Sequence, residues 1–174
     1  MFINIKENIN YAEDISIMMT EAFNSFYSTD DIIKLVNKSF ISLGYIENKI
    51  LIGYAGLLEM YSNITCELHP LIIKSEYRNM MVGSKLLKEL EREAKLKNVL
   101  NIMLGSDDED YKTNLHQFNF NNTDMSYILN NIKNINNHPY EFYQKNGYKI
   151  VGIFPNANGI GKPDIWLWKQ LIDI

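Results

Sequence analysis

The chain has 174 residues, 46% of them hydrophobic and 22% charged, with a formal net charge of −4. This length and composition fit one folded domain and exclude a largely disordered protein. The acidic balance argues against nucleic-acid binding, and no apolar run approaches the roughly 20 residues that cross a bilayer. The only cysteine is Cys66, so no disulfide can form within the chain, and the N-terminus is unlike a signal peptide. These features predict a cytoplasmic protein without a membrane or nucleic-acid partner.

The sequence up to Ile73 predicts short helices alternating with strands. Apolar residues recur at helical spacing in one segment, and Glu47-Asn48-Lys49 separates two apolar runs as a hairpin turn does. The expected elements are a strand at Met1–Ile5, helices at Tyr11–Phe23 and from a cap at Thr29 or Asp30 to Val36, and strands at Phe40–Ile46, Ile50–Leu58 and Thr65–Ile73.

Pro70 lies inside the last of these strands. Proline has no N–H to give to a sheet, so its presence predicts a β-bulge or a local splay between strands. A splayed strand leaves main-chain groups unpaired, and an extended ligand can bind to such groups.

The next segment, Arg78-Asn79-Met80-Met81-Val82-Gly83-Ser84, leads from this strand into the clearest helix of the sequence, Val82–Lys97. The start of a helix offers free N–H groups and the positive end of the helix dipole. A strand, a loop with glycine and a helix start in this order are typical of a phosphate site. The alternative is a plain connection between strand and helix.

The remaining sequence predicts further strands and helices around an acidic run. The expected elements are a strand at Val99–Leu104, the run Asp107–Asp110, a helix over Met125–Ile135, a helix at Tyr140–Lys145, and strands at Lys149–Phe154 and Ile165–Lys169. With no repeat and no linker, residues 1–174 are expected to form a single α/β (α+β) domain.

The phosphate-site segment, followed later by Tyr140–Tyr148, resembles the GNAT acetyltransferase superfamily. Four further segments are similar to the enterococcal chromosomal type of aminoglycoside 6′-N-acetyltransferase: Glu67-Leu-His-Pro70, Leu104-Gly-Ser-Asp-Asp108, His138-Pro-Tyr-Glu-Phe-Tyr143 and Lys162-Pro-Asp-Ile-Trp166. The likeness is dense from Glu67 to Trp166 and thin before Tyr61. The chain departs from that group at Cys66, where the group has tryptophan, and at Lys74, where an acidic residue can occur. Met81 replaces the first loop glycine of the superfamily, a glycine that the group also lacks.

This resemblance implies a GNAT fold, with a mixed, mostly antiparallel and splayed central sheet flanked by helices. It also implies transfer of acetyl from acetyl-CoA to the 6′-amine of an aminoglycoside, which confers resistance, by a homodimeric enzyme. The residues expected to bind acetyl-CoA are Leu71, Ile72, Ile73, Arg78, Asn79, Met81, Val82, Gly83, Ser84, Tyr143 and Lys145.

Acetyl transfer to an amine requires a base, a donor for the developing oxyanion and a proton for the leaving thiolate. Glu67 is the first candidate base, and His69, two residues on, shares its strand face by the period-two rule. A structural ion pair and a core histidine are the respective alternatives. Tyr143 stands where the superfamily has a tyrosine near the coenzyme sulfur, and it is expected to protonate or hydrogen-bond the thiolate. Covalent catalysis by Cys66 is not expected, because no activating base is evident beside it.

Binding of the cationic acceptor is expected at carboxylates and at one aromatic ring. Asp107 and Asp110 are the candidates in the acidic run, with a solvated loop as the alternative, and Glu67 and Tyr61 are the candidates elsewhere. No metal site is expected, since the three histidines show no ligand spacing.

Two other functions stay open at this point. The first is acetylation of a different amine, such as a polyamine or a peptide amine, with the same fold and cosubstrate. The second is a protein that binds acyl-CoA without catalysis. A panel of amines separates these functions, because the second predicts binding without turnover.

Overall fold

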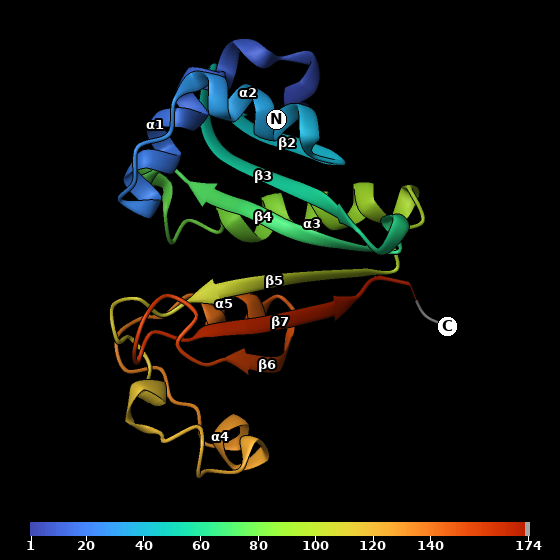
Figure 1. Ribbon diagram of the computed structural model, residues 1–174. Coiled ribbons are helices and arrows are strands. Elements are labelled where there is room, and N and C mark those ends of the chain that lie inside the picture. The colour runs from blue at the N-terminus through green and yellow to red at the C-terminus, as the bar shows by residue number, and fades with distance from the viewer. Residues whose placement is uncertain (173–174) are drawn as a thin grey trace. The chain divides into compact units, whose positions relative to one another are not determined.

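The computed structural model describes residues 1–172, which form an α/β fold of the expected GNAT type. A seven-stranded sheet has the order β1-β2-β3-β4-β5-β7-β6, is mostly antiparallel with one parallel pair, and is flanked by helices (Figure 1). The chain divides into two compact units, Met1–Ile102 with the segment from Leu171, and Met103–Gln170. No helix within residues 1–172 is both long and apolar enough to cross a membrane.

The described part of the first unit contains four antiparallel strands, three α-helices and short 3-10 turns. The strands and α-helices are β1 (Phe2–Asn4), α1 (Ala12–Phe23), α2 (Thr29–Lys38), β2 (Ile41–Glu47), β3 (Ile50–Met60), β4 (Thr65–Ile73) and α3 (Val82–Leu96). The turn between β2 and β3 places Asn48 and Lys49 at φ 50° and 65°, so both residues are left-handed. Two such residues match the twist of a tight hairpin, as the sequence predicted.

The start of α2 corrects the predicted cap. The Ser28 hydroxyl accepts a hydrogen bond from the Asp31 N–H at 3.2 Å, and the Asp31 carboxylate accepts one from the Ser28 N–H at 3.1 Å. This reciprocal pair is a capping box and satisfies two main-chain donors that the helix leaves free. The cap is therefore Ser28, because only this residue has the matching acid three positions on, and not Thr29 or Asp30.

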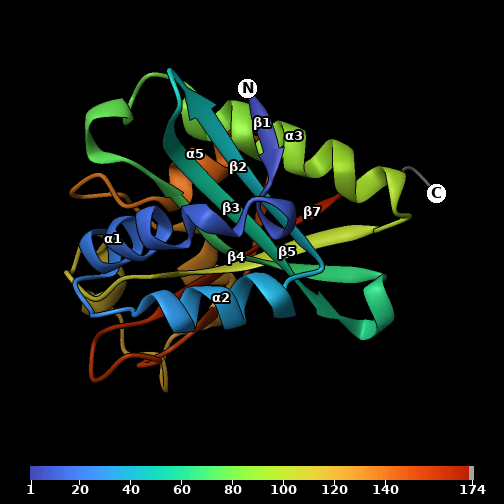
Figure 2. The same ribbon diagram turned by 90° about the horizontal axis from the view of Figure 1, so that it is seen from above.

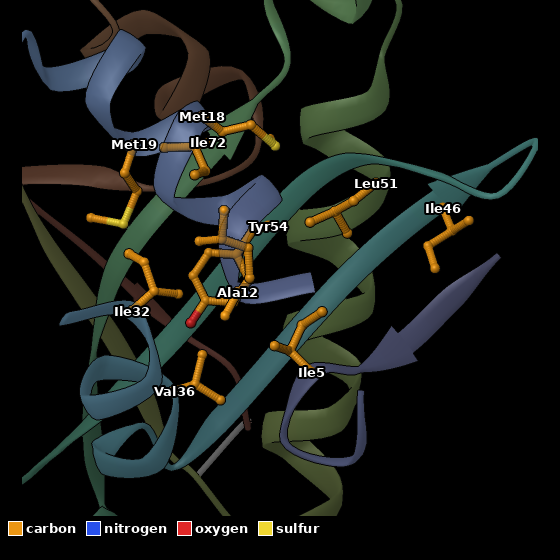
Figure 3. Packing of buried hydrophobic residues seen from close by; sticks show 11 residues of the cluster. Ile5, Ala12, Met18, Met19, Ile32, Val36, Ile46, Leu51, Tyr54 and Ile72 are labelled. Atoms are coloured by element: carbon orange, nitrogen blue, oxygen red, sulfur yellow. The ribbon is translucent and has the colours of Figure 1, made fainter. Parts of the chain in front are cut away.

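Helices cover both faces of the sheet in this unit. Helices α1 and α2 lie on one face and α3 lies on the other (Figure 2). The core under α1 and α2 is shown in Figure 3, where all but Ile15 are labelled, and comprises Ile5, Ala12, Ile15, Met18, Met19, Ile32, Val36, Ile46, Leu51, Tyr54 and Ile72. On the other face a Cβ atom placed on Gly53 lies 3.2 Å from Leu86 of α3. Tyr54 and Gly53 thus identify the two faces of β3.

A β-bulge interrupts the pairing of β3 with β4. Ala55 pairs with Leu71 and Leu57 pairs with Leu68, so two residues of β4, His69 and Pro70, lie opposite the single residue Gly56. The His69–Pro70 peptide bond is cis. The prediction of a bulge at Pro70 is confirmed, and the extra residue belongs to β4.

The second unit contains the rest of the sheet and two short helices. Its elements are β5 (Asn101–Asp107), most of which lies in this unit, α4 (Met125–Asn130), α5 (Tyr140–Lys145), β6 (Lys149–Phe154) and β7 (Asp164–Gln170). The bounds of α5 and β6 are those expected, and β7 is longer by one residue at each end. Strand β5 was placed too early, because it begins at Asn101 and continues into the acidic run at Asp107.

The helix expected over Met125–Ile135 ends at Asn130. Asparagine side chains beyond this point bind the main chain, and such bonds compete with helical ones. The Asn134 side chain accepts from the His138 N–H at 2.8 Å and donates to the His138 carbonyl at 3.0 Å. The apolar spacing that suggested a longer helix is therefore misleading, and Ile135 is 56% exposed.

Candidate active site

The bulge in β4 decides which face of the sheet carries Glu67. Ile72 pairs with Tyr54 and packs beneath α1 and α2. In a regular strand, Glu67, five residues away, would lie on the opposite face, toward α3. The extra residue of the bulge reverses this alternation, so Glu67 pairs with Leu58 and shares the α1/α2 face of the sheet with Tyr54.

His69 is the first of the two bulged residues and directly follows Leu68, which pairs with Leu57. The alternation along the strand up to this point places the side chains of Glu67 and His69 on the same face. Glu67 is half-buried between the buried residues Cys66 and Leu68, and His69 is exposed. The period-two expectation for Glu67 and His69 therefore agrees with the register. A carboxylate and an imidazole two residues apart are both placed to take a proton from an amine at this face.

Cys66 lies on the opposite face, paired with Glu59, and is completely buried. Burial, together with the nearby Glu59 carboxylate, raises the pKa of the Cys66 thiol to about 11. A thiol with such a pKa stays protonated at neutral pH, and thiols are weak nucleophiles. This agrees with the exclusion of covalent catalysis.

The end of β4 presents main-chain groups on the side away from β3. The Lys74 N–H donates to the Ile52 carbonyl at 3.0 Å. Since antiparallel pairs alternate between bonded and non-bonded, the main-chain groups of Ile72 point toward β3 and those of Leu71 and Ile73 point away from it. Of these three residues, all expected to bind acetyl-CoA, Leu71 and Ile73 therefore direct their N–H groups to that side.

The loop before α3 is built from left-handed residues. Asn79 has φ 62°, and Met81, which directly precedes the helix, has φ 60° and ψ 9°. This conformation is one that glycine adopts without strain. Met81 therefore reproduces the main-chain path expected of the missing glycine, and its side chain is 70% exposed.

The first turn of α3 has free main-chain donors. Met81 forms no side-chain cap, and the first helical bond runs from the Lys85 N–H to the Met81 carbonyl at 3.1 Å. The N–H groups of Val82, Gly83 and Ser84 precede that bond and have no partner within the helix. Arg78 adds a cation beside them, held by a 3.2 Å bond from its Nε to the Ile73 carbonyl. A row of N–H groups with a nearby guanidinium suits a pyrophosphate.

Tyr143 belongs to the second unit, on α5. Its ring is half-buried and makes edge contacts with Phe142 and Tyr148 at centroid distances of 5.1 and 5.9 Å. Burial raises the pKa of the Tyr143 phenol to about 12. At neutral pH the phenol is therefore fully protonated and can donate.

The acidic run separates into structural and exposed carboxylates. Asp108 is buried and accepts three hydrogen bonds, from the Lys112 N–H at 2.6 Å, the Thr113 N–H at 2.9 Å and the Thr113 hydroxyl at 2.6 Å. Asp110 is exposed, and its ion pair with Lys112 at 2.8 Å lowers the pKa of its carboxyl. Asp107 accepts from the Asn158 side chain. Asp107, Glu109 and Asp110 are exposed, and two of them, Asp107 and Asp110, are the candidates from the sequence.

His138 ties α5 to the end of β5. Its Nδ1 accepts from the Tyr140 N–H at 3.2 Å, so its Nε2 carries the proton that is donated to the Asp107 carbonyl at 3.0 Å. Burial lowers the pKa of His138, which keeps this tautomer neutral. The side chain therefore has a structural role.

Two further residues have plainly exposed positions. Tyr61, in the turn between β3 and β4, has φ 43° and is 74% exposed. Lys145, at the end of α5, makes a 3.8 Å ion pair with Glu141. Within residues 1–172, no group of three or more His, Cys, Asp or Glu side chains is arranged to hold a metal ion.

Comparison with known proteins identifies the family. Residues 11–120 match the model of the acetyltransferase (GNAT) family. None of the curated proteins compared with the chain matches it significantly.

Solved structures match the whole chain. An aminoglycoside 6′-N-acetyltransferase complexed with coenzyme A shares 31% identity at a TM-score of 0.93, covering 100% of this chain and 98% of that one. The aminoglycoside 6′-N-acetyltransferase from Enterococcus faecium shares 32% identity at a TM-score of 0.91, with the same coverage. An aminoglycoside 6′-acetyltransferase of type Ii shares 28% identity at a TM-score of 0.75 and covers 100% and 99% of the two chains. On the family match and these likenesses, the chain belongs to the GNAT family of acetyltransferases.

Proposed function

We propose that this acetyltransferase transfers acetyl from acetyl-CoA to the 6′-amine of an aminoglycoside, by direct attack of the amine. The observation that carries the proposal is the full-length likeness, at 31% and 32% identity, to two aminoglycoside 6′-N-acetyltransferases, one of them complexed with coenzyme A. The modified drug loses a cation, so it should bind ribosomal RNA less tightly and thereby confer resistance.

Acetyl-CoA supplies the activated acetyl group as a thioester. We assign its pyrophosphate to the N–H groups of Val82, Gly83 and Ser84, with Arg78 as the neighbouring cation. The left-handed conformations of Asn79 and Met81 support this assignment, because they direct the loop as glycine would. Lys145 is proposed as a further contact to the cosubstrate.

Glu67 or His69 takes the proton from the ammonium group, directly or through a water, so that the neutral amine can attack the thioester carbonyl. Main-chain N–H groups near Leu71 and Ile73 stabilise the negative charge that develops on the carbonyl oxygen. When the carbon–sulfur bond breaks, Tyr143 gives its phenolic proton to the departing sulfur. With a pKa of about 12 the phenol is protonated at neutral pH, so its O–H is present to donate to the sulfur.

Asp107 and Asp110 are proposed to bind further ammonium groups of the acceptor, and Tyr61 to offer an aromatic face. The net charge of −4 favours the approach of such a polycation.

The direct test is release of coenzyme A from acetyl-CoA, followed with a thiol reagent, against kanamycin, tobramycin, spermidine and a peptide amine. Turnover on the aminoglycosides alone, with NMR showing acetylation at the 6′-nitrogen, supports the proposal. Turnover on spermidine or the peptide instead would assign the enzyme to another amine. Binding of acetyl-CoA without turnover on any amine would refute catalysis.

Variants then separate the roles. Glu67→Gln should lower kcat by about 10² to 10⁴-fold if Glu67 is the base. Its matched control, Glu59→Gln, changes an exposed glutamate on the neighbouring strand and the opposite face, and should leave kcat unchanged. Tyr143→Phe should lower kcat, whereas Tyr127→Phe, at a tyrosine that is 56% exposed, should not.

The cytoplasm as location and a homodimer as assembly are part of the same proposal. The lone buried cysteine fits a reducing compartment. Sedimentation equilibrium of the purified chain, of mass 20.3 kDa, measures the assembly, and a monomer at micromolar concentration would contradict it.

A further inference from the structure

Gly56 lies where β3 faces the bulge of β4. It is the single residue opposite His69 and Pro70 of β4, and on its other side it pairs with Ser42 of β2. A Cβ atom placed on Gly56 lies 2.8 Å from the His69 carbonyl oxygen, 3.3 Å from the Tyr54 hydroxyl and 3.4 Å from the Ser39 hydroxyl. The first of these distances is shorter than carbon and oxygen allow, and the atom that would have to move belongs to the main chain.

The other glycines of the strands differ from Gly56 in this respect. A Cβ atom on Gly53 is closest to Ile73 Cδ1, the end of a side chain that can rotate. A Cβ atom on Gly152, in β6, meets nothing within 4 Å. Crowding against main chain at the bulge is thus a property of position 56.

The bulge in turn sets the orientation of Glu67. Without the extra residue, Glu67 would face α3, and Cys66 and Leu68 would exchange faces with it. A shift of one residue in register moves every side chain of a strand to the other face. The register around Gly56 therefore controls whether the carboxylate and imidazole are presented to an amine.

We infer that Gly56 is a positioning residue for acetyl transfer: its missing side chain admits the His69–Pro70 bulge, and the bulge turns Glu67 and His69 to their shared face. Gly56 touches neither substrate nor cosubstrate and acts through the β4 main chain. This inference rests on the proposed function only in assigning the proton transfer to Glu67 or His69.

The test compares Gly56→Ala with the matched control Gly152→Ala. Displacing a catalytic group by about 1 Å can cost a factor of about 10², so Gly56→Ala should lower kcat about ten- to a hundredfold. Since the N–H groups assigned to the pyrophosphate belong to α3, beyond the end of β4, the Kd for acetyl-CoA should change less than kcat. Gly152→Ala should match wild type in both quantities.

A second readout needs no substrate. The chain has three histidines, of which His116 and His138 lie in the other unit. In proton NMR, Gly56→Ala should shift the imidazole signals of His69, assigned with His69→Gln, and leave the other two unmoved. General destabilisation would not move one histidine selectively.

The two readouts separate the inference from the proposed function. A shifted His69 signal with reduced kcat supports the inference, whereas an unchanged kcat overturns it with or without a shift. If the wild type acetylates no amine, the proposed function fails, and an unshifted His69 signal would then still refute the effect of position 56 on the bulge. If Gly56→Ala does not fold, a double variant, Tyr54→Phe with Gly56→Ala, removes the contact between the new Cβ and the Tyr54 hydroxyl. Comparing the double variant with Tyr54→Phe alone then measures the effect of the remaining contact with the His69 carbonyl.

Discussion

Replacing Met81 with valine tests whether the left-handed turn before α3 is required for acetyl-CoA binding. Met81 has φ 60° and a side chain that is 70% exposed, so its replacement removes little buried surface. Non-glycine residues pay about 1–3 kcal/mol in the left-handed region, and a β-branched residue lies at the upper end of that range, so Met81→Val should add about 1–2 kcal/mol. This conformational cost is therefore the main effect of the substitution.

The cost has to appear in one of two quantities. If the loop keeps its turn, the melting temperature should fall by about 2–8 °C for a chain of this size. If the loop relaxes to negative φ, stability is preserved, but acetyl-CoA must then restore the turn, which weakens its Kd about five- to thirtyfold. Met81→Gly should show neither effect, because the relief of strain roughly offsets the larger chain entropy lost on folding.

Thermal unfolding and isothermal titration with acetyl-CoA measure both quantities on the same preparations. The control is Met80→Val, because Met80 is the neighbouring residue, is 59% exposed and does not take a positive φ. A Met81→Val protein with the melting temperature and Kd of wild type would refute the reasoning. An equal loss in Met80→Val would show that the loop is sensitive to any β-branched residue.

Three further outcomes are expected. Asp108→Asn should destabilise the fold by about 1–3 kcal/mol in urea unfolding, because it leaves buried donors without an acceptor. Asp110→Asn, at an exposed ion pair, should change stability by less than about 1 kcal/mol. Equal effects of the two variants would contradict the division into a structural and an exposed carboxylate. Burial lowers the pKa of His138 from 6.5, so as pH falls the unfolded chain takes up this proton before the folded chain does. The stability contributed by neutral His138 is complete above pH 6.5 and should decline as pH falls below that value. His138→Gln should flatten this part of the curve of stability against pH, and an unchanged slope would exclude His138 as its source. Cys66 should resist a thiol reagent in the native protein and react once per chain in denaturant, because its thiol is buried with a pKa of about 11; fast native labelling would contradict its burial.

Periodicity in the sequence was sufficient for the elements that carry the candidate site. The bounds of β4, α5 and β6 follow from apolar spacing and from the turn residues around them. Pro70 also predicted the bulge, because proline has no N–H to donate to a neighbouring strand. These signals are local: each depends on residues within a few positions of one another.

The helix prediction that failed depended on contacts between segments that are far apart in sequence. The helix after Met125 stops early because the Lys133 N–H donates to the Asn114 side chain and the Lys133 carbonyl accepts from the Asn114 main-chain N–H, which joins segments that are far apart in sequence. The sequence singled out Asp107 and Asp110 in the acidic run but did not predict that Lys112 and Thr113 would donate to Asp108, which is buried. The left-handed Met81 was likewise hidden, because methionine gives no sign of positive φ.

The face on which Glu67 lies is the clearest case of such a distant dependence. The spacing within β4 is enough to place Glu67 beside His69, but not to choose between the α3 face and the α1/α2 face of the sheet. That choice depends on one extra residue in β4 and on a glycine in β3 whose Cβ would meet the His69 carbonyl. The effect of this glycine comes from the absence of a Cβ atom, so the pattern of side chains in the sequence does not predict it. The face on which Glu67 lies is thus set by a cross-strand contact that only the three-dimensional register reveals.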